Sequence, residues 1–255
     1  MVLNVDDLPL SIDHLLGEES KNRVAKVGVE LEGAWTKLPL GAKLEIDNSV
    51  YKGTRIAGYQ YGELPSGPML PAAIPRFLKK YYPSAVDHTC GLHVHMSFDS
   101  LLRYAWLMSP RYPKTMVKYL SEWAKKEGFP ADHHIWDRLS GKSIYCQDKF
   151  WPDEQVNYLL KDHDQKRHGH RYTIVNYCGR YKTVEIRVLP MMSIVAQAIR
   201  AVNMVIDITN ACLVLLSEKE RKLSGKFELP NGYTYEEIRE KEIPLTSRQR
   251  KVILG

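Results

Sequence analysis

Three short segments of the chain alternate ionisable and apolar residues with a period of two, a pattern that an extended strand sorts onto separate faces. The segments are residues 29–32 (VELE), 92–95 (LHVH) and 184–188 (VEIRV). Side chains at positions i and i+2 point to the same side of a strand, so each segment has one ionisable face and one apolar face. The pattern predicts an α+β fold in which an antiparallel sheet is backed by helices.

The polar face predicted in this way has an unusual composition. It gathers carboxylates, imidazoles and one guanidinium: Glu30, Glu32, His93, His95, Glu185 and Arg187. An ordinary solvent-facing surface is a real alternative, because alternation is common in half-exposed sheets, but such a surface favours Thr, Ser and Lys. Carboxylates on neighbouring strands repel one another, and a divalent cation is the natural compensation. Oxygen-rich sites suit Mg²⁺ or Mn²⁺.

A further carboxylate, Glu63, ends another short predicted strand and precedes the rigid turn at residues 65–68 (PSGP). Alone it would indicate a surface residue, but beside the acidic strands it indicates a further metal ligand. The turn at residues 47–49 (DNS) has an ordinary explanation, since Asp and Asn favour turns by bonding their own backbone.

The other predicted elements follow from periodicity and turn signals. The segment 43–51 is expected to contain a short strand and a turn at 47–49, and a strand is expected at 58–64. A hairpin is expected to pair 171–177 with 182–188. Helices are expected at 71–82, 113–127 and 193–220, the last with apolar positions three and four apart. Trp123 is expected in the core, whereas residues 129–151 support no assignment.

The composition predicts a soluble, cytoplasmic protein. The chain has 255 residues, 44% of them apolar, and four scattered cysteines without a C-x-x-C pair, which indicates free thiols in a reducing compartment. No signal peptide or membrane span is expected. The net charge of +6 suits anionic ligands such as nucleotides. The basic residues are too dispersed to argue for nucleic acid.

Five segments, in this order, resemble the amidoligase family of the glutamine synthetase-like carboxylate–amine ligases. They are GVELEG at 28–33, DNS at 47–49, GELPSGPM at 62–69, CGLHVHMS at 90–97 and RYTIVNYCGRYKTVEIRVLP at 171–190. The resemblance implies a glutamine synthetase-like catalytic domain with a curved antiparallel sheet at 1–222. It leaves 99–165 as a variable, substrate-facing insertion and 223–255 as a polar C-terminal extension.

The resemblance also implies a reaction. ATP would convert a carboxylate to an acyl phosphate, and an amine would then displace phosphate to form an amide or isopeptide bond. Two or more Mg²⁺ or Mn²⁺ ions would bind alongside ATP. The acid and amine would be small molecules or peptides, and neither their identity nor the oligomeric state follows from the sequence.

The resemblance implies a role for each residue that matches a functional position of the family's motifs. One metal would be held by Glu30, His93 and Glu185, and a second by Glu32 and Glu63. Arg187 and Arg171 would contact the phosphates and act in catalysis, and His95 would touch the nucleotide. Substrate contacts are expected from Asp47, Ser49 and Asn176. The family's second metal has a third carboxylate ligand, and Asp47 is not expected to supply it.

Two other function classes remain open. A two-metal hydrolase or phosphotransferase would use the same acidic site, although the pairing of Glu185 with Arg187 in E-I-R disfavours it. A non-enzymatic module that binds nucleic acid or protein would need a concentrated basic face, which the sequence does not show. The histidine-rich tracts at 133–134 and 163–170 lack regular ligand spacing, and we expect no second metal site there.

Overall fold

A computed structural model describes residues 26–51, 55–97, 111–147, 172–178 and 183–224 of the chain. Its centre is a five-stranded, fully antiparallel sheet in the order β2-β1-β3-β7-β6. The strands are β1 (Lys26–Trp35), β2 (Gln60–Pro65), β3 (Gly91–Ser97), β6 (Val175–Cys178) and β7 (Thr183–Pro190). The α+β class and the antiparallel sheet predicted from the alternating segments are confirmed.

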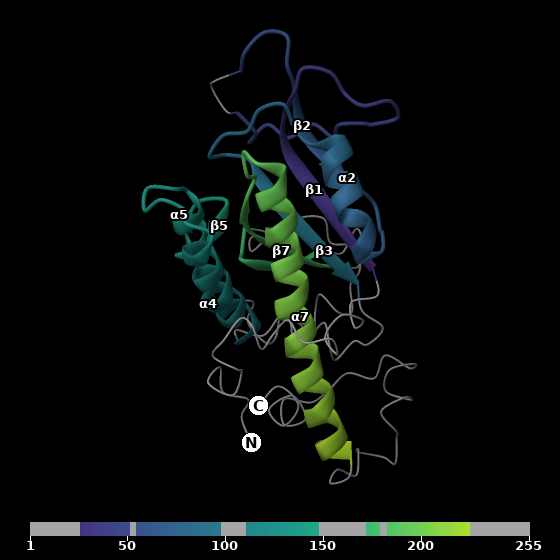
Figure 1. The fold of residues 1–255 in the computed structure, drawn as a ribbon, viewed down its shortest axis with the longest axis vertical. Helices are drawn as coiled ribbons and strands as arrows, with labels where there is room; N and C mark the ends of the chain where they lie inside the picture. Colours follow the sequence, from purple (N-terminus) through teal and green to yellow (C-terminus); the bar gives the residue numbers. More distant parts are fainter. Residues whose placement is uncertain (1–25, 52–54, 98–110, 148–171, 179–182, 225–255) are drawn as a thin grey trace.

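Helices cover the apolar face of this sheet. The long helix α7 (Val195–Ser224) crosses it, with α2 (Ile74–Tyr81) on one side and α4 (Arg111–Lys126) on the other (Figure 1). The 3₁₀ turn η3 (Pro71–Ala73) leads into α2. No helix among the described residues combines the length and apolarity needed to cross a bilayer.

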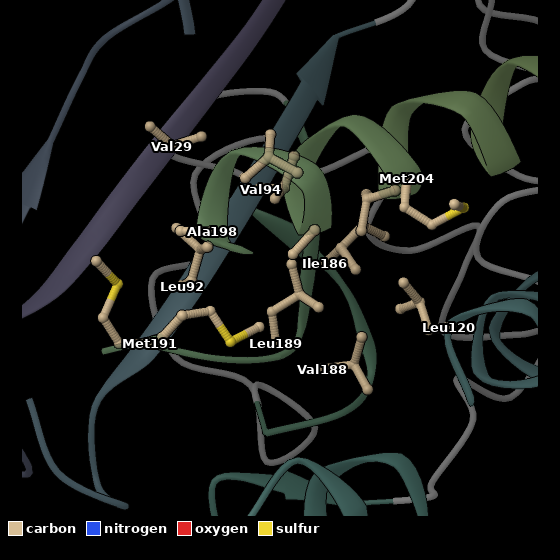
Figure 2. Packing of buried hydrophobic residues seen from close by; sticks show 14 of the residues in the cluster. Val29, Leu92, Val94, Leu120, Ile186, Val188, Leu189, Met191, Ala198 and Met204 are labelled. Carbon is tan, nitrogen blue, oxygen red and sulfur yellow. The ribbon is translucent and has the colours of Figure 1, made fainter. Parts of the chain in front are cut away.

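The core lies between α7 and the apolar residues of the alternating strands. Val94 and Ile186 are fully buried in the middle of this cluster, beside Ala198 and Met204 of α7 (Figure 2). Trp123 of α4 is also part of the core, as predicted. Because the period of two sends these side chains to the helical layer, the ionisable residues between them must lie on the opposite face of the sheet.

The segment 43–51 was predicted to contain a short strand and a turn at 47–49; the turn forms, but the strand is reduced to a single bridge. The segment makes one bridge, in which the backbone N–H of Glu45 donates to the Glu63 carbonyl at 2.8 Å and the N–H of Glu63 donates back at 3.0 Å. The side chain of Asp47 then accepts hydrogen bonds from the backbone N–H and hydroxyl of Ser49, at 2.7 and 2.6 Å. This local turn ends the extended conformation two residues after the bridge.

The segment that the sequence left unassigned contains a short helix and a small hairpin. Helix α5 (Ile135–Leu139) packs against β7, and β4 (Lys142–Ser143) pairs with β5 (Cys146–Gln147). Together with α4, this places much of the predicted insertion at 99–165 in contact with the core. Its substrate-facing role stays a prediction.

The ladder between β3 and β7 contains a bulge that the sequence did not indicate. Leu92 lies opposite Leu189 and Val94 lies opposite Ile186. Two residues of β7, Arg187 and Val188, therefore occupy the interval that β3 fills with His93 alone. A bulge of this kind takes backbone groups out of the ladder and re-aims a side chain, and bulges are common beside active sites.

The packing predicts how substitutions at two isoleucines will differ. Ile186→Ala removes a fully buried side chain and should lower the free energy of unfolding by about 2–5 kcal/mol. Ile144 is 68% exposed, so Ile144→Ala should change it by no more than about 0.5 kcal/mol. Urea denaturation of both variants measures the difference, and equal losses would contradict the assigned core.

Candidate metal centre

Cross-strand pairing brings the ionisable residues into one row across the sheet. Residues directly opposite each other on antiparallel strands have Cβ atoms about 4.5–5.5 Å apart, so paired positions are in reach of one another. The register pairs Glu63 with Glu32, Glu30 with His93, and His95 with Glu185. Four strands thus contribute to a single polar surface.

The first acidic group consists of Glu30, His93 and Glu185. The His93 Nδ1 atom lies 3.3 Å from a carboxylate oxygen of Glu30 and 3.3 Å from one of Glu185. One ligand atom from each residue lies within 4.8 Å of the other two, and all three residues are buried. The structure therefore brings together the three residues predicted to hold the first metal.

The second acidic group consists of Glu32, Glu63 and Asp47, whose ligand atoms also lie within 4.8 Å of one another. Glu32 is buried, and the other two are partly buried. Asp47 was not expected in this group. The backbone bridge between Glu45 and Glu63 holds its segment against the edge of β2 and brings the Asp47 carboxylate to the site. Asp47 keeps its turn role as well, through its bonds to Ser49.

His93 and Gly91 join the two groups. The His93 Nε2 atom lies 3.7 Å from Glu32, and the Gly91 N–H donates a hydrogen bond to the same carboxylate. A Cβ at position 91 would lie 2.6 Å from His93 Nε2 and 3.0 Å from the Glu32 carboxylate. Only glycine fits at this position. The sequence signal for it was the Gly91 that begins the predicted strand, but its role in the site was not foreseen.

Arg187 lies at the Glu185 end of the row. Its Nη1 donates to Glu185, whose other oxygen accepts from the Asn176 side-chain amide at 2.9 Å. The Arg187 Nε is buried and makes no hydrogen bond within the described part of the chain. Such a donor is suited to an anionic ligand. The Asn176 amide thus helps to orient Glu185, and its predicted contact with substrate stays a prediction.

His95 contacts Glu30, one of the predicted metal ligands. Its Nε2 lies 3.2 Å from Glu30, and its Nδ1 lies 2.9 Å from the Thr183 hydroxyl. The residue is buried, with 6% of its surface exposed. The geometry thus makes His95 an orienting neighbour of Glu30, and its predicted contact with the nucleotide stays a prediction.

The two acidic groups differ in electrostatic balance. Burial would raise the pKa of both Glu30 and Glu185, but the nearby imidazoles, and Arg187 in the case of Glu185, lower both below the ordinary value. Burial raises the pKa of Glu63 to about 8, and the negative charges of Glu30 and Glu32 add to the shift. The first group is neutralised by its own neighbours, whereas the second retains a repulsion that a cation would relieve.

The donor atoms fit magnesium or manganese. The second group offers only carboxylate oxygens, and the first offers two carboxylates and one imidazole. Hard divalent cations prefer oxygen ligands, and Mn²⁺ tolerates one imidazole. His133 and His134 belong to no such group among the described residues; their rings stack at 4.3 Å, and burial lowers the pKa of His134 to about 4.

Some predicted residues lie outside the described parts of the chain. Arg171, expected to contact phosphate, is one of them, and so are the histidines of the tract at 163–170. No protein-family model matches the chain, and no curated protein matches it at a significant level. The amidoligase resemblance of the five motifs therefore stays a prediction, and the geometry of the two groups carries the functional argument.

The raised pKa of Glu63 predicts a pH dependence of stability. The folded pKa of about 8 exceeds the ordinary value of 4.5, so the folded metal-free protein binds the extra proton. Its free energy of unfolding should therefore fall as the pH rises from about 5 to 8. Urea denaturation across this range should show the decline, and Glu63→Gln should flatten it. An equally steep decline in the variant would assign the effect to another group.

Proposed function

We propose that this protein is an ATP-dependent carboxylate–amine ligase that forms an amide or isopeptide bond through an acyl phosphate. The observation that carries the proposal is the pair of acidic groups on one sheet face, which are joined by His93 and have Arg187 beside them. Phosphoryl transfer from ATP depends on positioning and charge neutralisation, which such a site supplies. The order of the five motifs supports the same class.

In this proposal each acidic group holds one ion. Glu30, His93 and Glu185 would hold the first, and Glu32, Asp47 and Glu63 the second. Bound Mg²⁺ or Mn²⁺ supplies charge neutralisation for the ATP phosphates and the developing acyl phosphate. His95 and Asn176 keep the carboxylates of Glu30 and Glu185 oriented, as neighbours of metal ligands do in well-ordered sites.

Arg187 is the candidate phosphate contact. One nitrogen of its guanidinium is bonded to Glu185, and its buried Nε has no partner in the described residues. The nearby carboxylates, Glu185 first, raise its pKa against the effect of burial, so it stays charged. A planar guanidinium donates two parallel bonds to phosphate oxygens in one fork, a geometry that the lysine ammonium does not have.

The reaction has two balanced steps. An oxygen of the acid substrate attacks the γ-phosphorus, the bond to the β-phosphate oxygen breaks, and ADP leaves. The amine nitrogen then attacks the acyl carbon, the carbon–oxygen bond breaks, phosphate leaves, and the nitrogen loses a proton. The chain's own residues orient the reactants and offset negative charge in both steps, without forming a covalent intermediate with the protein.

Nucleotide binding gives the first test. Calorimetric titration of a non-hydrolysable ATP analogue should show binding that requires Mg²⁺ and is lost in Glu30→Ala, because the first group can no longer hold its ion. Glu127→Ala is the matched control, since Glu127 pairs with Arg200 on the surface. Magnesium-independent binding would contradict the proposed role of the metal ions. Absence of binding to the folded wild type would contradict the proposal and favour a two-metal hydrolase.

Turnover gives the second test. With a suitable acid and amine, ADP release should require both substrates together. Glu185→Gln should reduce it at least about a hundredfold, because a neutral amide replaces a metal ligand and the partner of Arg187. Asp137→Asn, at an exposed position, should retain wild-type turnover. Unchanged turnover in a folded Glu185→Gln protein would remove Glu185 from the reaction.

A further inference from the structure

Arg138 of α5 is a buried cation that the predicted motifs do not include. Its side chain is 2% exposed and ranks among the largest fully buried side chains of the described residues. No carboxylate in the described part of the chain forms an ion pair with it. Burying a guanidinium is costly unless hydrogen bonds compensate, so its position calls for a specific role.

Within the described residues, the hydrogen bonds of Arg138 go to backbone carbonyls next to the two acidic groups. Nη1 donates to the Arg187 carbonyl at 3.2 Å, and Nη2 donates to those of Cys90 at 3.2 Å and Thr89 at 3.4 Å. One guanidinium thus connects β7 with the residues that lead into β3.

The first of these hydrogen bonds, from Arg138 to the Arg187 carbonyl, is made at the bulge of β7. Arg187 and Val188 together oppose His93, and a bulge leaves backbone groups without a ladder partner. The Arg138 guanidinium supplies a donor to the Arg187 carbonyl at this point. It therefore stabilises the irregularity that sets the position of Arg187 relative to Glu185 and His93.

The other two hydrogen bonds, to the carbonyls of Thr89 and Cys90, are made directly before Gly91 in the chain. The Gly91 N–H holds the Glu32 carboxylate, and the space at Gly91 is limited to a hydrogen by His93 and Glu32. A shift of this peptide would therefore move Glu32 or press on His93. Asp87 secures the same turn from the other side, where its carboxylate accepts from the Thr89 N–H at 2.9 Å.

We propose that Arg138 is a positioning residue that fixes the geometry of both acidic groups by bridging the β7 bulge and the Thr89–Cys90 turn. This inference rests on the metal centre of the proposed function. Arginine is required because its fork reaches carbonyls on two strands at once, whereas the lysine ammonium is a compact charge that cannot hold them in the same geometry.

Loss of the Arg138 charge and loss of its bridging hydrogen bonds are expected to have opposite effects on metal binding. Removing a cation beside carboxylates would by itself strengthen the binding of a divalent ion, by Coulomb's law. Removing the bridge loosens the ligands and weakens binding, typically about 10–100-fold for residues that orient metal ligands. Arg138→Met loses both charge and bridge, while Arg138→Lys keeps the charge and loses the bridge.

The experiment measures Mn²⁺ affinity by calorimetry and the electron paramagnetic resonance spectrum of bound Mn²⁺, on folded protein well below its melting temperature. Both Arg138 variants should bind Mn²⁺ at least about tenfold more weakly than wild type, with a changed spectrum. Leu139→Ala is the matched control for α5, since it removes a buried side chain that makes none of these bonds. Arg200→Met, which removes a surface arginine, controls for net charge.

Both controls should keep Mn²⁺ affinity within about twofold of wild type, even though Leu139→Ala is less stable. Wild-type affinity in Arg138→Lys, with equal or tighter binding in Arg138→Met, would show that only the charge matters and would overturn the proposal. Should Arg138→Met fail to fold, Arg138→Lys decides the question. Absence of Mn²⁺ binding to wild type would overturn the metal centre and this inference together. Intact binding without ADP release would reject only the ligase.

Discussion

The contacts of His93 with three buried carboxylates determine how the rest of the site is arranged. Its ring lies 3.3 Å from Glu30 and Glu185 and 3.7 Å from Glu32, on the central strand of the sheet. Removing carboxylates from water is expensive unless hydrogen bonds and opposite charges compensate. The neighbouring side chains of His95, Asn176 and Arg187 supply this compensation for Glu30 and Glu185. Most of the polar face is therefore occupied in holding these two carboxylates.

These side chains compensate the first acidic group but not the second, and this difference separates the two groups. Glu32 accepts a hydrogen bond from the Gly91 N–H, but Glu63 and Asp47 lie near it without an ion pair to any cationic side chain in the described parts of the chain. The raised pKa of Glu63, caused by burial and by nearby negative charge, expresses this imbalance. A metal at the second group would have to displace a proton from Glu63, so its affinity would rise with pH. Ion binding there would also stabilise the fold.

The alternation in three segments was sufficient to predict the sheet and its two faces, and the resemblance of the motifs then predicted which residues form the first acidic group. This worked because strand pairing preserves a period of two, so residues on one face of neighbouring strands must come together wherever the register allows. Asp47 was not expected in the second acidic group because its position there depends on a single backbone bridge between Glu45 and Glu63. No periodic pattern encodes such a contact. The short strand predicted within 43–51 is reduced to that one bridge, whereas the turn predicted at 47–49 forms. Local turn chemistry at Asp47 ends the extended conformation there.

Arg138 and the β7 bulge were beyond sequence reasoning for a related physical cause. A bulge changes the pairing by one residue without altering the alternation on either strand, so VEIRV has the same pattern with or without it. The arginine that supports it comes from a five-residue helix in a segment without clear periodicity. Residues that act on metal ligands through the backbone leave no pattern in their own neighbourhood. The tertiary structure is therefore where such residues have to be found, by asking which buried charges have only carbonyls as partners.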